Sequence, residues 1–124
     1  MNENIRYFID GKYINIETFK KNGNSVRTPV WYIIYNNIIY IRSDKNSGKV
    51  KRIRKNTHVR IAKCNMFGKL NGEIIEGTAH VNENKIEKNI DKFFDNKYGI
   101  KNKIIKLMYK IKKINMVLIS VKIN

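Results

Sequence analysis

Short runs of β-branched and aromatic residues alternate with polar turns along most of the chain. Two such runs, Val30–Tyr35 and Ile38–Ile41, are separated by Asn36-Asn37, and asparagine tolerates the positive φ of a tight hairpin turn. The same pattern predicts six strands in all: Tyr13–Phe19, Ser25–Tyr35, Ile38–Ile41, Val59–Cys64, Glu73–Val81 and Met116–Ile123. Pro29 has no N–H to donate, so its strand is expected at a sheet edge or with an irregularity.

Apolar residues at helical spacing predict helices between these strands. A first helix is expected within residues 3–10, with Ile5, Phe8 and Ile9 on one face, and a short one at Val50–Lys55, with Val50 and Ile53 inward. Asn84 and Glu87 form a capping-box-like start for a third helix, which is expected to end at Gly99. Its stripe comprises Ile86, Ile90, Phe93 and Phe94, and a lysine-rich segment at 101–113 has a second stripe of Ile104, Ile105, Met108 and Ile111.

These elements predict a single domain over residues 1–124, of the α+β class and mainly β. Antiparallel strands of this length close into a small barrel and so remove exposed edges. We therefore expect a six-stranded antiparallel barrel with short flanking helices, and we expect the basic segment at 101–113 to pack its apolar stripe on that barrel.

The chain is strongly basic, with 26 Lys and Arg against 10 Asp and Glu and a formal net charge of +16. Such a charge favours anionic partners such as nucleic acid, a membrane surface or a polyanionic coenzyme. The sequence has neither a long apolar run nor a signal-peptide pattern, and its single Cys64 suits a reducing compartment. We expect a cytoplasmic protein without a membrane partner or a metal site.

Basic residues gather around one predicted helix start. Nine Lys or Arg side chains lie between Arg42 and Lys63 against one acid, Asp44, and Ser47-Gly48-Lys49 opens the helix. A helix start presents unpaired N–H groups and the positive end of the helix dipole, which together attract anions. Arg42, Ser47, Lys49 and Arg52 are thus candidates for holding a phosphate. The alternative is an ordinary serine cap beside solvated lysines.

The sequence shows no arrangement that is typical of catalysis by protein side chains. There is no Ser-His-Asp set, no carboxylate cluster and no glycine-rich phosphate loop of the Rossmann or Walker kind. Chemistry carried by a bound cofactor fits this composition better. Hydride transfer suits such a site because it needs donor and acceptor to be placed together and no protein nucleophile.

Several segments, taken in order, carry a family resemblance: TPVW, IYIRSD, SGKVKRIRKN, CNMFGKLNGEIIEGTAHV and KYG. Together they resemble the pyridoxamine 5'-phosphate oxidase-like FMN-binding split-barrel superfamily, and more closely its branch of F420-dependent oxidoreductases. The resemblance extends from about Tyr13 to Leu118. It implies a split β-barrel, a homodimer with two equivalent sites at the interface, and a flavin or deazaflavin coenzyme.

The resemblance also implies which residues hold the coenzyme. The strand that contacts the ring in the family matches Thr28, Pro29, Val30 and Trp31, and the phosphate ligands match Arg42, Ser43, Ser47 and Lys49, followed by Lys51 and Arg52. Tyr32 stands where the oxidases proper have a lysine, and these oxidases lack a proline at the position of Pro29. Oxidation of pyridoxamine phosphate is therefore not expected.

We expect coenzyme F420 rather than the alternative, FMN. The deazaflavin has a glutamate tail, and Lys51, Arg52, Arg54 and Lys55 offer partners to its carboxylates, although an exposed ion pair contributes only about 0–1 kcal/mol. The expected reaction is hydride transfer to a small molecule. The remaining alternatives are a non-catalytic flavin carrier and a nucleic-acid-binding barrel that stacks bases on Tyr32, Tyr35, Tyr40 and Phe67.

Overall fold

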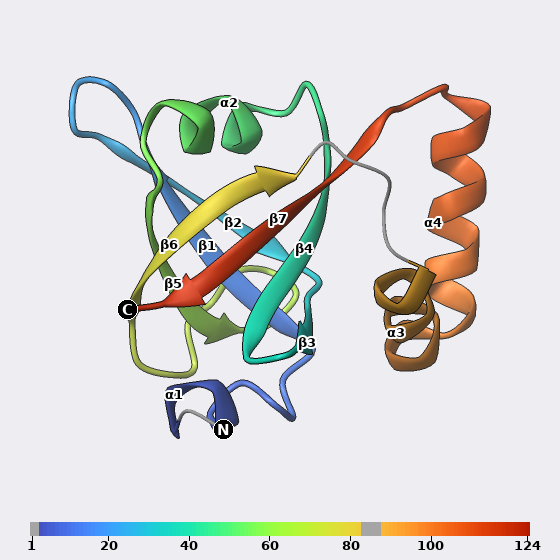
Figure 1. Cartoon of the computed structure of the whole chain (residues 1–124), viewed down its shortest axis with the longest axis horizontal. Coiled ribbons are helices and arrows are strands. Elements are labelled where there is room, and N and C mark those ends of the chain that lie inside the picture. The colour runs from blue at the N-terminus through green and yellow to red at the C-terminus, as the bar shows by residue number, and fades with distance from the viewer. Residues whose placement is uncertain (1–2, 83–87) are drawn as a thin grey trace.

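The computed structural model describes residues 3–82 and 88–124, and one curled antiparallel sheet forms the body of this part of the chain (Figure 1). Its strands are β1 (Tyr13–Phe19), β2 (Ser25–Val30), β3 (Ile33–Tyr35), β4 (Ile38–Asp44), β5 (His58–Cys64), β6 (Ile75–Asn82) and β7 (Met116–Ile123). Their order across the sheet is β2-β1-β5-β6-β7-β4-β3. The prediction of a mainly β, split-barrel fold is confirmed, with seven strands in place of the expected six.

The extra strand arises because the predicted strand Ser25–Tyr35 is divided at Trp31 and Tyr32. The Tyr32 N–H donates to the Tyr98 hydroxyl (2.9 Å), and the Tyr32 carbonyl accepts from the Lys97 ammonium (2.8 Å). These side chains replace the neighbouring strand as partners, so the strand ends there. β2, which contains Pro29, lies at one edge of the sheet as predicted, and β3 lies at the other. Only Trp31 and Tyr32 connect β2 at one edge to β3 at the other. The sheet must therefore curl so that its two edges come close together.

The predicted turn between the third and fourth strands is present. Asn36 and Asn37 have φ values of 51° and 63°, and the flanking residues pair in a tight antiparallel register, with Tyr35 opposite Ile38. Two consecutive residues with positive φ define the turn that matches the natural twist of a hairpin. Local turn chemistry therefore determines the register of β3 and β4.

Four helices accompany the described sheet: α1 (Glu3–Arg6), α2 (Gly48–Lys55), α3 (Lys88–Tyr98) and α4 (Ile100–Ile111). α1 is shorter than expected, and Ile9 is exposed although Ile5 and Phe8 are buried. α2 begins as predicted, since the Ser47 hydroxyl accepts from the Val50 N–H, and Val50 and Ile53 are buried. The predicted helix start at Asn84–Glu87, including Ile86, lies outside the described residues.

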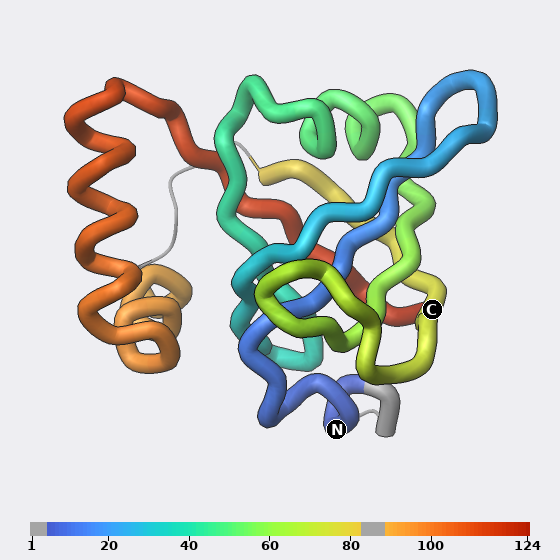
Figure 2. The backbone as a smooth tube through the Cα atoms, turned by 180° about the vertical axis from the view of Figure 1, so that it is seen from behind, coloured from blue at the N-terminus to red at the C-terminus, as the bar shows by residue number. Residues whose placement is uncertain are grey.

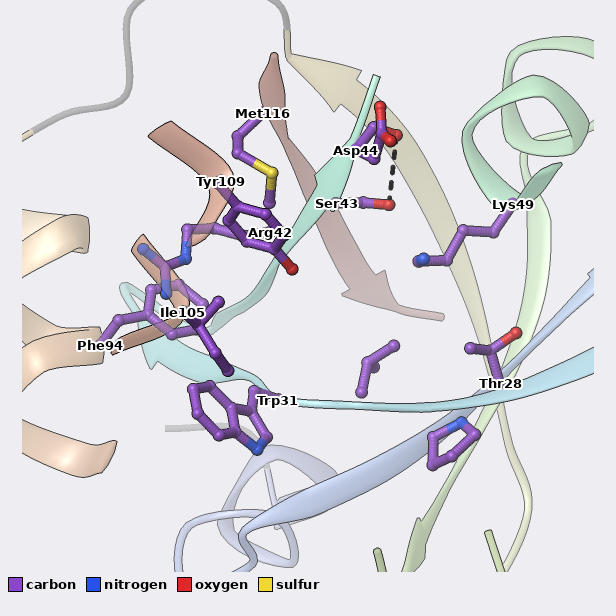
Figure 3. Close-up of a pocket in the computed structure, with 12 residues that line it drawn as sticks. Thr28, Trp31, Arg42, Ser43, Asp44, Lys49, Phe94, Ile105, Tyr109 and Met116 are labelled. Carbon is purple, nitrogen blue, oxygen red and sulfur yellow. Dashed lines mark hydrogen bonds between the residues drawn. The ribbon is translucent and has the colours of Figure 1, made fainter. Parts of the chain in front are cut away.

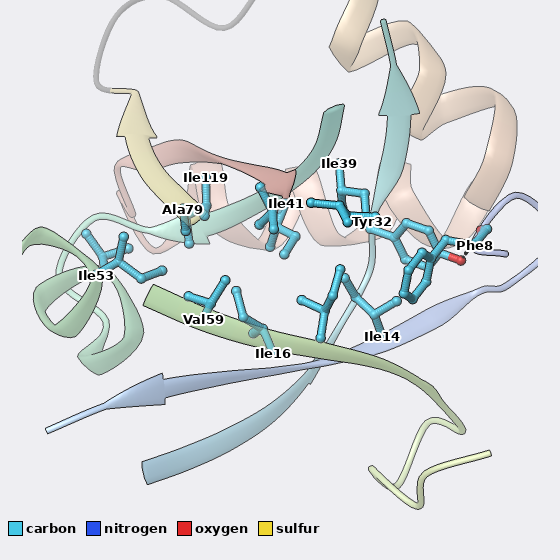
Figure 4. Packing of buried hydrophobic residues seen from close by; sticks show 14 of the residues in the cluster. Phe8, Ile14, Ile16, Tyr32, Ile39, Ile41, Ile53, Val59, Ala79 and Ile119 are labelled. Atoms are coloured by element: carbon cyan, nitrogen blue, oxygen red, sulfur yellow. Dashed lines mark hydrogen bonds between the residues drawn. The ribbon is translucent and has the colours of Figure 1, made fainter. Parts of the chain in front are cut away.

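The interior of the curled sheet is a dry core of aliphatic side chains (Figure 4). Alternate residues of each strand point inward, so that β1 contributes Ile14 and Ile16 and β4 contributes Ile39 and Ile41. Tyr32 closes one end of this core, and its hydroxyl donates to the carbonyl of Phe8. Both ends of the tyrosine are thus held, which fixes the chain where it passes from β2 to β3.

α3 and α4 form a helical pair inserted between β6 and β7, which are themselves direct neighbours in the sheet. The backbone tube seen from behind shows the pair standing beside the barrel rather than inside it (Figure 2). α3 packs on the outside of the sheet, where Ile90 and Phe94 meet Ile33 and Leu118. Gly99 takes a φ of 61° and turns the chain from α3 into α4.

The expectation that the basic segment packs its apolar stripe on the barrel is wrong. The outward face of α4 carries what we call the outer stripe: Ile100, Ile104, Leu107, Met108 and Ile111, each 46–73% exposed. The opposite face buries Asn102, whose amide donates to Asp95 (2.5 Å) and accepts from Arg42. Ile105 is the one member of the predicted stripe that turns toward the barrel, into the pocket described below. The hydrogen bonds of Asn102 therefore determine which face of α4 is buried, and that face is not the apolar one.

Candidate functional site

A pocket of about 280 Å³ opens at the split of the barrel, between β2 and β4 (Figure 3). β2 supplies Thr28, Pro29 and Val30, followed by Trp31, and β4 supplies Arg42, Ser43 and Asp44. Lys49 enters from α2, Met116 from β7, and Phe94, Ile105 and Tyr109 from the helical pair. Elements that are distant in the sequence thus share one cavity.

One end of the pocket is polar and cationic. The Ser43 hydroxyl lies 2.9 Å from the Ser47 hydroxyl, which in turn accepts from the Val50 N–H (3.4 Å) as the cap of α2. The Lys49 ammonium reaches toward the cavity from the first turn of the same helix (Figure 3). Two hydroxyls, a helix start and an ammonium group form an arrangement that attracts an anion.

The charge of Lys49 is not balanced within the described chain. Burial, and then the charge of Arg52, lower the pKa of Lys49, while Asp44 opposes this effect. Among the described residues, no hydrogen-bond acceptor or carboxylate contacts the Lys49 ammonium. A half-buried ammonium without a partner is costly, and a bound anion would relieve that cost.

The other end of the pocket is aromatic. The Trp31 and Tyr98 rings stack with centroids 4.3 Å apart and planes 6° from parallel, and Phe94 continues the stack 6.2 Å from Tyr98. The Tyr98 hydroxyl donates to the Lys12 carbonyl (2.7 Å) and accepts from the Tyr32 N–H (2.9 Å), so the stack is held rigidly. This end offers flat apolar surfaces to a ligand ring.

Arg42 lies at the aromatic end and is engaged with the helices. Its guanidinium lies 4.3 Å from the centroid of the Phe94 ring, forms an ion pair with Asp91 (3.3 Å) and donates to Asn102. Burial lowers the pKa of Arg42, and Asp91 opposes this shift. The structure therefore shows Arg42 anchoring α3 and α4 to β4 rather than joining Lys49 at the cationic end.

The structure brings together most, but not all, of the site residues expected from the sequence. Seven of them line the pocket: Thr28, Pro29, Val30, Trp31, Arg42, Ser43 and Lys49. Ser47 lies beside it through Ser43. Lys51 and Arg52 instead line a separate groove between α2 and the turn that joins β1 and β2.

Sequence reasoning did not assign Asp44, Phe94, Ile105, Tyr109 or Met116 to the site. Phe94 and Ile105 both belong to predicted apolar stripes, which indicated that they would be buried. The stripes alone did not indicate which of their residues would line the pocket. Asp44 and Met116 pair directly across β4 and β7, so the sheet register could have linked them.

A second groove of about 570 Å³ adjoins the pocket and shares Arg42, Tyr109 and Met116 with it. Lys45, Lys106 and Lys110 line this groove together with one acid, Asp91. Lys106 is paired with Asp91 at 2.9 Å. The pocket therefore opens toward a predominantly basic surface beside α4.

No protein-family model matches the sequence, and no curated protein matches it. Solved structures do match the fold. A candidate pyridoxamine 5'-phosphate oxidase from Listeria innocua aligns with a TM-score of 0.58 and 13% identity, over 91% of this chain and 84% of that one. A protein described as F420 reductase aligns with a TM-score of 0.64 and 12% identity, over 100% and 96% of the two chains.

The chain has the fold of the pyridoxamine 5'-phosphate oxidase-like split-barrel proteins. Another protein with this fold is the heme storage protein HutZ from Vibrio cholerae, with a TM-score of 0.68 and 9% identity, over 98% of this chain and 87% of that one. In this chain, neither His58 nor His80 lines the pocket. Within residues 3–82 and 88–124, no set of three His, Cys, Asp or Glu side chains could hold a metal ion.

The helices of the described segments are also too short or too polar to cross a bilayer.

Proposed function

We propose that this protein binds a flavin-type coenzyme and acts as an oxidoreductase that transfers hydride to a small molecule. The observation that supports this proposal is the two-ended pocket. The Lys49 ammonium, which has no ion-pair partner among the described residues, lies at one end, and an aromatic wall with the stacked Trp31 lies at the other. A tricyclic ring joined to a phosphate through a short chain matches both ends.

In this proposal the protein contributes position and electrostatics. Lys49, Ser43 and Ser47 hold the phosphate, and the start of α2 adds its dipole. Thr28, Pro29 and Val30 lie on the edge strand β2, and Trp31 follows it. The outer backbone groups of this strand are available to the polar edge of a ring. When bound, the coenzyme would supply the hydride, and no protein nucleophile is required.

We further propose coenzyme F420 rather than FMN. The basic groove beside α4 shares three residues with the pocket and contains Lys45 and Lys110. A glutamate tail that leaves the pocket in this direction would meet these cations. FMN ends at its phosphate and would leave the groove unused. This route replaces the one expected along α2, because Lys51 and Arg52 line a different groove.

We also propose a homodimer. A pocket of about 280 Å³ lies at the lower limit of ligand sites, which commonly measure about 300–1,000 Å³. A partner subunit would supply the missing wall. The outer stripe on α4 leaves five large apolar side chains exposed, and apolar surface of this kind commonly marks an interface. On another face of α4, Ile105 and Tyr109 already line the pocket.

Titration of the purified protein with coenzyme F420 and with FMN, at low and moderate salt, tests the proposal. We expect tight binding of the deazaflavin that weakens as its glutamate tail is shortened. Reduced deazaflavin should then be oxidised by a panel of unsaturated or carbonyl acceptors only in the presence of protein. Binding without turnover on any acceptor would favour a carrier, and tighter binding of FMN would reject the choice of coenzyme.

A further inference from the structure

A groove of about 650 Å³ separates the turn between β1 and β2 from the C-terminal half of α2. Figures 1 and 2 show this turn and α2 side by side at one end of the barrel. The groove is lined by five cationic side chains, Lys20, Lys21, Lys51, Arg52 and Lys55, and by no acidic one. Two segments that are distant in the sequence thus contribute positive charge to one concave surface.

The five cations have no carboxylate partner among the described residues. The ion pairs of the described acidic side chains lie elsewhere: Asp10 with Lys63, Glu17 with Arg27 and Arg60, Glu76 with Arg60 and His58, Asp91 with Arg42 and Lys106, and Asp95 with Lys106. Arg52 is held only by a neutral contact, from its Nε to the Thr18 hydroxyl (2.7 Å). That contact orients the guanidinium and leaves its charge uncompensated.

The helix dipole explains only part of this arrangement. Cations near the C-terminus of a helix are stabilised by its dipole, which accounts for Lys55 but not for Arg52, whose guanidinium turns back toward Gly48 at the start of the helix. It does not account for Lys20 and Lys21, which come from the turn between β1 and β2 and lie on the opposite wall. Like charges on facing walls repel each other, and an anion between them would reverse that repulsion.

We propose that this groove is a binding site for an oligophosphate, a ligand with two or three phosphates linked in a row. The guanidinium of Arg52 presents a fork that matches phosphate oxygens, and lysines on both walls contribute point charges. The site is separate from the coenzyme pocket, with which it shares no lining residue. The proposal therefore does not depend on the proposed function.

The surroundings of Phe19 favour a short polyanion over a nucleic acid. The Phe19 ring closes one end of the groove and stacks on His58 with centroids 5.1 Å apart. His58 Nε2 in turn lies 2.9 Å from a carboxylate oxygen of Glu76, whose side chain is 48% exposed. Glu76 also pairs with Arg60 (3.0 Å), whose guanidinium lies over the Phe19 ring. A long phosphodiester chain that continued past Phe19 would therefore gain no free cation there, whereas a di- or triphosphate would end within the groove.

Calorimetric titration with inorganic tripolyphosphate tests the site, and titration with a nucleoside triphosphate tells whether a base adds to the affinity. The groove variants are Lys20→Ser/Lys21→Ser and Lys51→Gln/Lys55→Gln. The matched control is Lys101→Gln/Lys103→Gln, which removes two exposed lysines from α4. We expect each groove variant to bind tripolyphosphate about tenfold more weakly or worse, and the control to change affinity less than about twofold.

Three outcomes would overturn the proposal. Equal losses in the groove and control variants would mean that the net charge alone attracts the ligand. A loss of tripolyphosphate affinity in Lys49→Met that exceeds the loss in the groove variants would mean that phosphate binds in the pocket lined by Lys49 instead. A single-stranded oligonucleotide that binds more tightly than tripolyphosphate, with a steeper salt dependence, would assign the groove to nucleic acid. Thermal unfolding of each variant confirms that the loss is not one of folding.

Discussion

Replacing Lys49 tests the proposed coenzyme site most directly, because this side chain has no hydrogen-bond or ion-pair partner among the described residues. In Lys49→Met the stem of the side chain is kept and only the ammonium is removed. A charge-assisted contact to phosphate contributes about 1.5–3 kcal/mol, so the affinity for the phosphate-bearing coenzyme should fall about ten- to a hundredfold. Ser47→Ala should cost less, since the Ser47 hydroxyl also serves as the cap of α2.

The burial of Lys49 makes a second, opposite effect measurable in the same variant. In the free protein, burial and the nearby Arg52 disfavour the charged ammonium and lower its pKa. Removing that charge should raise the free energy of unfolding of the ligand-free protein at neutral pH while it weakens coenzyme binding. A residue that served only to stabilise the fold would not show this opposition.

The pH dependence of binding follows from the same residue. Because the anion binds the protonated ammonium, affinity should be constant at low pH and should fall as pH rises through the lowered pKa of free Lys49. Fluorescence quenching of the deazaflavin, measured between neutral and alkaline pH, would report both the plateau and the decline. Lys49→Met should lack this decline.

Lys122→Ala is the matched control, since Lys122 is exposed on β7 and lines neither the pocket nor its basic groove. An exposed lysine contributes about 0–1 kcal/mol at most, so this variant should bind the coenzyme almost as the parent protein does. If Lys122→Ala weakens binding as much as Lys49→Met, diffuse electrostatics explains the affinity and the focused site is refuted.

Three further outcomes are expected. Leu107→Glu places a charge in the outer stripe and should shift light scattering from dimer to monomer with a loss of coenzyme affinity; a parent protein that is already monomeric and binds fully would refute the homodimer. Tyr98→Phe leaves the buried Tyr32 N–H without its acceptor and should cost about 1–3 kcal/mol in denaturant unfolding; no loss would mean that water replaces the hydroxyl. Burial lowers the pKa of Lys97 to about 8, so the unfolded chain binds the extra proton between about pH 8 and 10.5. The free energy of unfolding of the parent protein minus that of Lys97→Met should therefore rise across that range. A difference that stays constant with pH would contradict the lowered pKa of Lys97.

Local chemistry made much of the sheet predictable. The pair Asn36-Asn37 specified a hairpin because both residues accept positive φ, and Ser47 specified the start of α2 because its hydroxyl caps the helix. Both signals lie within a few residues of the structure that they determine. The division of one strand at Trp31 and Tyr32 was not predictable in this way, because the partner that ends it is Tyr98.

The same distinction applies to the site. The position of Lys51 could have been deduced from helical phase, since residues 51 and 55 share a face that turns away from residue 49, whereas residue 52 is a near neighbour of residue 49 on the helix surface. The orientation of α4 could not, because its apolar stripe predicts the reverse of what is found. It depends on a contact between Arg42 and Asn102, and no periodicity reveals a buried polar pair that joins distant elements.

The insertion of α3 and α4 between two neighbouring strands separates the folding of the sheet from the shape of the pocket. β6 and β7 pair directly, with Asn82 opposite Leu118, so a tight turn could in principle replace residues 83–115 without altering the order of strands. The cationic end of the pocket belongs to β4 and α2, whereas much of the aromatic end belongs to the inserted pair. If the pocket binds the proposed coenzyme, exchange of this helical pair would change which ring fits while the anchoring of the anionic group stayed with the barrel.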